Sequence, residues 1–191
     1  MLSPISVRAN YTKDTWRSDQ PGAILFTNFE TFIFLNDSIS ACYLNTTLGI
    51  PCGQGSVPPI GVDARSESDV RTARAVNFAK KHNLELVVKG TGHDFIGRST
   101  ARGSFLIWTH HMNLIRLSFL KVLQYQQKIR LMVILSWYFR ISSDRSFSIS
   151  LAAVTFGAGV QWHDAYDFVQ KQGRTVVGGA AHTQLVLPED G

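Results

Sequence analysis

The sequence predicts a mixed α+β fold, and three observations support this prediction. Two apolar, β-branched runs end in glycine-rich turns, at residues 84–92 and 152–159. A pattern typical of an amphipathic helix, at residues 67–82, follows a short apolar run at 60–64 and precedes the first of these two runs. The order strand, helix, strand predicts a βαβ unit, and 191 residues with 45% hydrophobic content are enough for one domain with a core.

The net charge of +5 would ordinarily favour a nucleic acid partner, but its distribution argues against one. Residues 115–150 carry six basic side chains and one acidic side chain, and the rest of the chain has thirteen of each. Because the basicity belongs to one segment, we expect no nucleic acid partner. The mean hydropathy of +0.01 and the short apolar runs also lead us to expect no membrane partner.

The first fifty residues contain two apolar runs, at residues 22–26 and 31–35, which are candidates for strands. They also contain both cysteines, Cys42 and Cys52, which lie in no CxxC pair and lack further ligands at a spacing that suits zinc. A disulfide between the two is one interpretation, and two buried free thiols are the other.

Three glycosylation sequons begin at Asn10, Asn36 and Asn45, and none follows later in the chain. This clustering favours a secreted glycoprotein. No signal peptide is visible after Met1, since neither a basic segment nor an apolar core follows it. We therefore expect either that the protein is intracellular or that the true N-terminus is missing from the sequence.

The region after residue 50 is predicted to alternate strands with a helix. The helix pattern has Ser66 at its start and acidic residues in its first turn, where they stabilise the helix dipole. The predicted strands are residues 60–64, 84–88 and 104–109. The loop after the second strand thus lies at a carboxyl end, which is a common position for ligands in α/β sheets.

This loop, residues 90–99, is called the glycine loop below. It contains Gly90, Gly92 and Gly97, and successive backbone N–H groups in such a loop can cradle a phosphate. The pattern is neither a dinucleotide-binding GxGxxG that opens a helix nor a Walker loop. A plain glycine-rich turn is the alternative, and His93 within the loop is either a cofactor contact or a structural histidine.

The other histidines and the serines offer weaker signals. His110 and His111 are adjacent, so they point in different directions from a strand, and we interpret them as surface or packing residues. His163 and His182 have no partners that the sequence identifies. Ser99 lacks the Gly-x-Ser-x-Gly context of a nucleophile.

Residues 115–150 differ in character from the rest of the chain. They contain none of its fifteen glycines or six prolines, and they show no turn signals and no clear period. We interpret them as an atypical insert that is not native domain sequence, of the kind that intron read-through or a frameshift would produce. A basic membrane-binding insert is a weaker alternative.

Beyond residue 151 the ordinary pattern returns. Residues 152–160 are predicted to be a strand that ends in a Gly-x-Gly turn, and residues 162–172 a helix closed by Gly173. A further strand is predicted at 174–177, followed by Gly178 and Gly179.

Taken together, these motifs resemble a known family. The residues are KGTGHDFIGRS at 89–99 and IWTHHM at 107–112, supported by CGQGSVP at 52–58, AKKHN at 79–83, VTFGAGVQW at 154–162 and GRTVVGG at 173–179. They are similar to fungal FAD-linked oxidoreductases related to berberine bridge enzyme, in the vanillyl-alcohol oxidase/p-cresol methylhydroxylase (PCMH) superfamily. The resemblance covers residues 16–114 and 152–183, and it implies a PCMH-type FAD-binding domain of two α/β lobes.

The resemblance also implies a set of site residues. His93 would be bonded through its ring to the 8α-methyl carbon of the flavin, and FAD would be the cofactor. The cofactor-binding residues would be Gly90, Thr91, Gly92, His93, Asp94, Gly97, Arg98 and Ser99 in the first lobe, with Gly157, Gly159, Val177, Gly178 and Gly179 in the second. A small organic molecule would give up a hydride, and oxygen would be the usual electron acceptor.

Two departures limit what the resemblance implies. Ala181 stands where bicovalent members of the family have a cysteine, so the attachment would be through His93 alone. The chain ends before a substrate domain and its catalytic base, so we expect a truncated form and assign no catalytic residue. The expected parts are an extension at 1–50, a partial FAD-binding domain at 51–183 and an unrelated tail at 184–191. An inactive remnant without catalytic function is the alternative.

Overall fold

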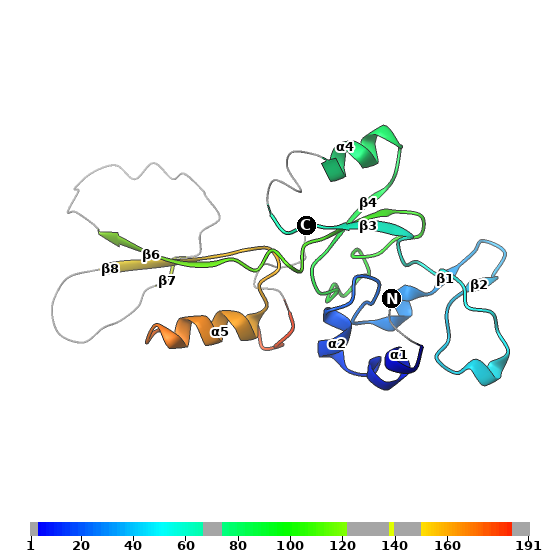
Figure 1. The fold of residues 1–191 in the computed structure, drawn as a ribbon, viewed down its shortest axis with the longest axis horizontal. Coiled ribbons are helices and arrows are strands. Elements are labelled where there is room, and N and C mark those ends of the chain that lie inside the picture. The colour runs from blue at the N-terminus through cyan, green and yellow to red at the C-terminus, as the bar shows by residue number, and fades with distance from the viewer. Residues whose placement is uncertain (1–3, 67–73, 122–137, 140–149, 185–191) are drawn as a thin grey trace.

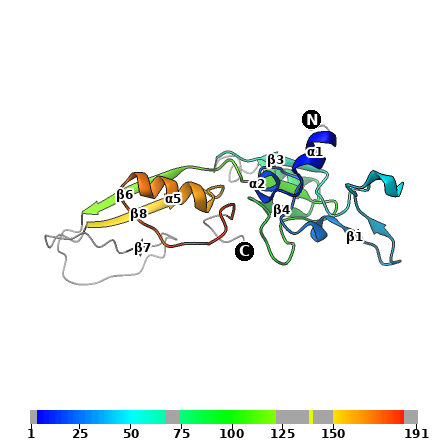
Figure 2. The same cartoon turned by 90° about the horizontal axis from the view of Figure 1, so that it is seen from below.

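The computed structural model describes residues 4–66, 74–121, 138–139 and 150–184. Two three-stranded sheets lie apart along the long axis of the molecule, with a two-stranded hairpin beyond the first of them, and the chain crosses between the two larger sheets after strand β5 (Figures 1 and 2). The first sheet lies between helix α4 (Arg74–Lys81) and the N-terminal segment (Figure 1). The second sheet has helix α5 (Trp162–Lys171) beside it.

The first sheet is parallel and has three strands in the order β3 (Ile60–Asp63), β5 (Phe105–Trp108) and β4 (Leu86–Lys89). All three strands were predicted. However, β3 and β4 are not neighbours, because β5 lies between them and pairs with both. Each of the four β5 residues is buried, as expected for a central strand covered on both faces.

Helix α4 packs on one face of this sheet through Ala75 and Ala79, which join Phe105 and Ile107 in a buried cluster. The predicted helix begins at residue 67, but residues 67–73 lie outside the described part of the chain. The opposite face buries Val87, Leu106 and Trp108. Each face of the central strand β5 therefore carries apolar contacts.

The N-terminal segment begins with helices α1 (Pro4–Asn10) and α2 (Asp14–Ser18), followed by the 3-10 turn η1 (Thr27–Glu30). The expected strand at residues 22–26 does not form. Its backbone instead bonds to loop and side-chain groups, since Leu25 N donates to Gly92 O at 2.9 Å and Ile24 N donates to the Glu30 carboxylate at 2.8 Å. These contacts seat the segment directly on the glycine loop.

A small hairpin follows, formed by β1 (Phe32–Ile33) and β2 (Ile39–Ser40), so only two residues of the run at 31–35 are strand. Beyond it, Cys42 and Cys52 form a disulfide, which confirms the first interpretation of this pair. The ten-residue separation that the bridge closes contains the short turn η2 (Thr46–Leu48).

The second sheet is antiparallel, with β6 (Ile115–Lys121) and β7 (Tyr138–Phe139) on either side of β8 (Ser150–Phe156). Ile115 pairs with Phe156, and the register runs without a break to the far end of both strands. Residues 115–121 of the segment interpreted as an atypical insert form strand β6, where Ile115 and Leu117 alternate with Arg116 and Ser118. The interpretation of residues 115–150 as an insert stays a prediction. Residues 122–137 and 140–149 lie outside the described part.

Helix α5 follows β8 closely as predicted, and Gly173 ends it with a left-handed φ of +65°. The strand expected at 174–177 is not present. In its place the chain runs back along the helix, where Gly178 and Gly179 lie against the Trp162 ring and Tyr166 donates to Gly179 O at 2.8 Å. Within the described residues, none of the helices is long and apolar enough to cross a membrane.

Candidate functional site

The glycine loop starts where β4 ends, and β3 and β5 end at the same edge because the strands are parallel. Residues 90–94 are all buried. Gly92 has a φ of +83°, a region that favours glycine, and a Cβ there would lie 3.3 Å from the backbone oxygen of Ala23. The loop thus makes a tight turn beneath the N-terminal segment.

His93 is held at both ring nitrogens by threonine hydroxyls. Its Nδ1 lies 2.8 Å from Thr91 Oγ1, and its Nε2 lies 3.0 Å from Thr183 Oγ1. All three side chains are buried, with 7% of His93 and 4% of Thr183 exposed. Because Thr183 is ninety residues away in the sequence, the imidazole connects the two halves of the molecule.

Asp94 braces the next part of the loop. Its Oδ2 accepts hydrogen bonds from the backbone N–H groups of Ile96 and Arg98, and its Oδ1 pairs with the Arg98 guanidinium at 2.6 Å. Burial acts to raise the pKa of Asp94, but the hydrogen bonds and charge of Arg98 outweigh it and hold the pKa below its usual range. Asp94 is therefore an ionised internal support for the loop.

The outer part of the loop is more open. Phe95 and Ile96 are 74% and 68% exposed, although the Phe95 ring contacts that of Phe26 at 5.1 Å. Gly97 lies directly over the Phe29 ring, and Ser99 is buried. The loop therefore presents apolar side chains outward beside a polar, buried base.

Two buried residues support the loop from below. The Trp108 indole N–H donates to Gly90 O at 3.0 Å, and the Lys89 ammonium donates to the carbonyls of Gln20 and Pro21. Lys89 is only 1% exposed, and its stem lies beside Gly92. Because it bonds the N-terminal segment, Lys89 ties residues 20–21 to the base of the glycine loop.

The resemblance also implied five cofactor-binding residues in the second half of the chain, and the surroundings of these five differ from one another. A Cβ on Gly157 would lie 2.1 Å from Met112 O, and one on Gly159 would lie 2.2 Å from His110 O. These two glycines allow the end of β8 to pass close to the turn after β5. Gly178 and Gly179 contact Trp162, whereas Val177 is 77% exposed.

His110 and His111 pack as expected of structural residues. Their rings meet edge to face at 5.0 Å, and His110 stacks on Trp108 at 5.1 Å. They face different carboxylates, since His110 Nε2 lies 3.3 Å from Asp19 and His111 Nδ1 lies 2.8 Å from Asp63. Burial lowers the pKa of His110 despite the opposing charge of Asp19.

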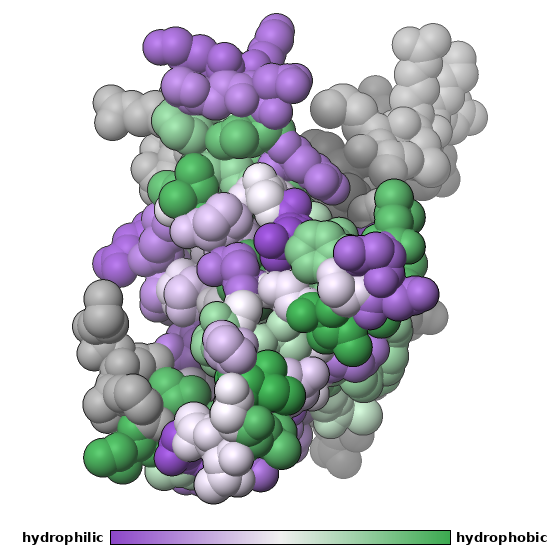
Figure 3. All heavy atoms as spheres, turned by 90° about the vertical axis from the view of Figure 1, so that its right-hand side faces the viewer, coloured by the Kyte–Doolittle hydropathy of each residue, from purple (hydrophilic) through white to green (hydrophobic). Residues whose placement is uncertain are grey.

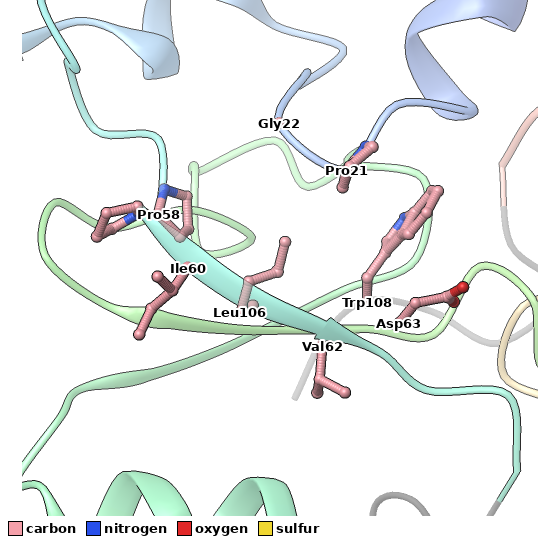
Figure 4. Close-up of a pocket in the computed structure, with 10 residues that line it drawn as sticks. Pro21, Gly22, Pro58, Ile60, Val62, Asp63, Leu106 and Trp108 are labelled. Carbon is pink, nitrogen blue, oxygen red and sulfur yellow. The ribbon is translucent and has the colours of Figure 1, made fainter. Parts of the chain in front are cut away.

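Two hollows flank this region. One, of about 430 Å³, lies between Pro21 and Gly22 on one side and β3 on the other, with Leu106 and Trp108 pointing into it and Val62 pointing away (Figure 4). The other, of about 350 Å³, is lined by residues of polar type, among them Asp19, His163, His182 and Thr183. His163 and His182 meet here, because His163 Nδ1 lies 2.9 Å from His182 O.

Sequence reasoning missed two residues of the site, Thr183 and Lys89. Neither has a local signal of its role, since Thr183 sits in a short turn and Lys89 ends a strand. Only the three-dimensional contact with His93 identifies Thr183. In chemical terms the site is a buried imidazole on a tight glycine loop with a hydroxyl at each ring nitrogen, so a bond at either nitrogen would replace the hydroxyl contact made there.

No model of a known protein family matches the chain. Curated relatives include an uncharacterised FAD-linked oxidoreductase of Arthroderma benhamiae, 37% identical over 179 residues, which are 93% of this chain and 26% of that protein. A VAO-type flavoprotein oxidase of Thermothelomyces thermophilus is 31% identical over 163 residues, or 85% of this chain and 23% of that protein. The chain thus spans about a quarter of the length of these relatives.

Solved structures agree with these relatives. A VAO-type flavoprotein from Myceliophthora thermophila C1 superposes with a TM-score of 0.65 and 26% identity, covering 95% of this chain and 27% of that chain. A second VAO-type flavoprotein from the same source has a TM-score of 0.62 at 23% identity, which shows a shared fold.

Proposed function

Because this chain belongs to the fungal FAD-linked oxidoreductases of the VAO type, we propose that its glycine loop binds FAD and that His93 is the attachment residue. The fold is the expected α+β one and corresponds to part of a flavoprotein. One observation carries the proposal. A histidine on a tight glycine loop is buried and fixed at both ring nitrogens, at the carboxyl edge of a parallel sheet.

In this proposal the loop residues have separate tasks. Gly90, Thr91 and Gly92 bring the backbone close to the pyrophosphate, as successive N–H groups do in other anion sites. Asp94 and Arg98 hold the following turn in shape through their ion pair. A ring nitrogen of His93 would hold the flavin at its 8α carbon, in place of one of the two threonine contacts and of one C–H bond of that carbon, and the bound flavin would supply the hydride-accepting chemistry. Gly97 and Ser99 would complete the contacts of the loop with the cofactor.

The second half of the molecule supplies the opposite wall. Gly157 and Gly159 keep β8 close to the turn after β5, and Gly178 and Gly179 keep the last turn against Trp162. Val177, which is largely exposed, would face the cofactor. Thr183 links this wall to the attachment residue through the His93 Nε2 contact.

For the whole enzyme, we propose hydride transfer from a small organic substrate to the flavin, with oxygen as the electron acceptor. The names of the relatives, including a flavin-dependent oxygenase of Aspergillus ustus 36% identical over 102 residues, or 53% of this chain and 18% of that protein, support this class of reaction. The described residues supply no assigned catalytic base. We also propose a secreted glycoprotein, because a disulfide closes the loop between Cys42 and Cys52 and three sequons lie nearby.

An inactive remnant without catalytic function is the second candidate. The two candidates differ in flavin retention. The full chain is expressed with FAD and denatured in acid, and the protein pellet is examined for flavin absorbance. We expect retained absorbance that His93→Ala abolishes and that the exposed control His182→Ala leaves in place. Colourless folded protein supports the remnant, and FAD released by acid excludes the covalent link.

A further inference from the structure

The three sequons in the N-terminal segment differ in their surroundings. Asn10 lies in the last turn of α1 and is only partly exposed. Its Nδ2 donates to Ser6 O at 2.9 Å, and its Oδ1 accepts from the Lys13 ammonium at 2.9 Å. The amide of Asn10 is therefore engaged at both ends by the folded chain.

Asn45 is exposed and lies within the loop that the Cys42–Cys52 disulfide closes. Its Oδ1 accepts from Thr47 N at 3.1 Å and from Thr47 Oγ1 at 2.6 Å. The middle residue, Thr46, accepts a hydrogen bond from the Arg8 guanidinium at 2.8 Å, which ties the loop to α1. In the described part of the chain, Asn45 Nδ2 donates to no protein group.

Asn36 repeats this geometry in the turn between β1 and β2. Its Oδ1 accepts from Ser38 N at 3.3 Å and from Ser38 Oγ at 2.8 Å. Asp37 has a φ of +62°, so the middle residue of the sequon turns the chain outward. Within the described residues, Asn36 Nδ2 likewise makes no hydrogen bond and faces solvent.

We propose that Asn45 and Asn36 carry N-linked oligosaccharides and that Asn10 does not. In both sites the sequon hydroxyl contacts the amide oxygen of its own asparagine, and the amide nitrogen is left open to solvent. The modification forms a bond between Nδ2 and the anomeric carbon of the sugar. The bond from that carbon to the lipid pyrophosphate donor breaks, and the amide releases one proton.

The sugars on Asn36 and Asn45 would lie beside exposed apolar side chains and would keep these from associating with other molecules. Apolar side chains are exposed on the hairpin and on the disulfide loop, and Figure 3 views this side of the molecule, where green apolar and purple polar surfaces alternate. The side chains are Ile33, Leu35, Ile39, Leu44, Leu48 and Ile50. Exposed apolar side chains favour association between molecules, and a bulky hydrated sugar beside them opposes it.

The test is site occupancy. The full chain is expressed behind a secretory leader in a eukaryotic host, and its intact mass is measured before and after enzymatic removal of N-glycans. We expect Asn45→Gln and Asn36→Gln each to remove one glycan and Asn10→Gln to remove none. Thr47→Val should abolish occupancy at Asn45, whereas Thr46→Val, which loses the Arg8 contact but keeps the sequon, should not.

A glycan on Asn10, or none on Asn45 or on Asn36 in protein that enters the secretory pathway, would overturn the proposal. The mass is read whether or not flavin is bound, so this result is separate from that of the flavin experiment. As a second readout, we expect the double variant Asn36→Gln/Asn45→Gln to aggregate at lower concentration than Asn10→Gln. If the double variant and Asn10→Gln aggregate at the same concentration, the sugars do not shield the exposed apolar side chains.

Discussion

At the residue scale, His93 and the two hydroxyls that contact it behave as one unit. A neutral imidazole donates from one nitrogen and accepts at the other, whereas a hydroxyl does both, so the threonines accommodate either tautomer. Thr91 belongs to the same loop, and Thr183 comes from the other half of the molecule. The ring can point correctly only when both halves are in place.

Thr183→Val should weaken the attachment of flavin to His93. The substitution keeps the shape but leaves a buried imidazole nitrogen without that hydroxyl, which costs about 1–3 kcal/mol of stability. We expect a several-fold lower fraction of acid-stable flavin and a shift in the ring ¹⁵N resonances of His93 in flavin-free protein. Thr183→Ser, which keeps the hydroxyl, is the control. Equal retention in both variants would show that Thr183 does not position the ring.

Asp94→Asn should change how stability depends on pH. The folded-state pKa of Asp94 lies below its unfolded value, so its contribution is complete above about pH 4 and is lost as the pH falls through the folded pKa. We expect the variant to lose about 2 kcal/mol at pH 6 and a smaller amount at pH 3, below the unfolded pKa, since it keeps no ionised acceptor for the two backbone N–H groups. Urea unfolding at the two pH values measures both differences, and an equal loss at both would contradict the assignment.

At the element scale, the end of β8 fixes how the second sheet meets the first. Gly157 N donates to Leu114 O and Gly159 N donates to Met112 O, so the ladder of β6 and β8 continues past the assigned strands toward the turn after β5. No Cβ fits at either glycine. The wall that carries Thr183 is therefore positioned by backbone contacts.

Gly159→Ala should move the end of β8 away from the turn after β5. Its Cβ would lie 2.2 Å from His110 O, so the backbone must shift, at a cost of about 1–3 kcal/mol. We expect a lower thermal transition and less acid-stable flavin, because Thr183 moves with its segment. The neighbouring Ala158→Ser serves as the control. A variant with unchanged melting would show that the turn after β5 adapts freely.

At the scale of the whole molecule, the N-terminal segment belongs to the site and is not a separate appendage. Residues 20–25 bond the glycine loop and Lys89, while the hairpin and disulfide loop project from the far side of the first sheet (Figure 1). The predicted boundary at residue 50 is thus crossed by contacts that shape the loop. Loss of the first twenty-five residues would expose Lys89 and unsupported loop backbone.

The disulfide between Cys42 and Cys52 should stabilise the loop that it closes and leave the stability of the first sheet unchanged. Closing a loop of ten residues lowers the entropy of the open chain by an amount worth about 2–3 kcal/mol. In Cys42→Ser/Cys52→Ser we expect faster proteolysis between residues 43 and 51, with the amide exchange of β4 and β5 unchanged. Slower exchange in the wild-type sheet than in the variant would instead show that the bridge stabilises the whole molecule.

Short-range patterns in the sequence determined those helices, strands and turns that are specified by residues close together in the chain. Strands β3, β4 and β5, helix α5 with its closing Gly173 and the glycine loop follow from apolar periodicity and turn residues, whereas for the cysteine pair the sequence left both a disulfide and free thiols open. The motifs around these elements also determined the family. Each of these depends on residues within about one turn or one strand of each other.

Only the tertiary structure decided the contacts between distant residues. No short-range sequence pattern predicts that β5 lies between β3 and β4 or that Ile115 pairs with Phe156. The same is true of the contact between Thr183 and His93. The strand expected at 174–177 does not form either, and the residues that follow it, Gly178 and Gly179, pack on Trp162. A strand exists only with a partner, and a buried histidine is oriented only by the groups that surround it, so both depend on the folded chain.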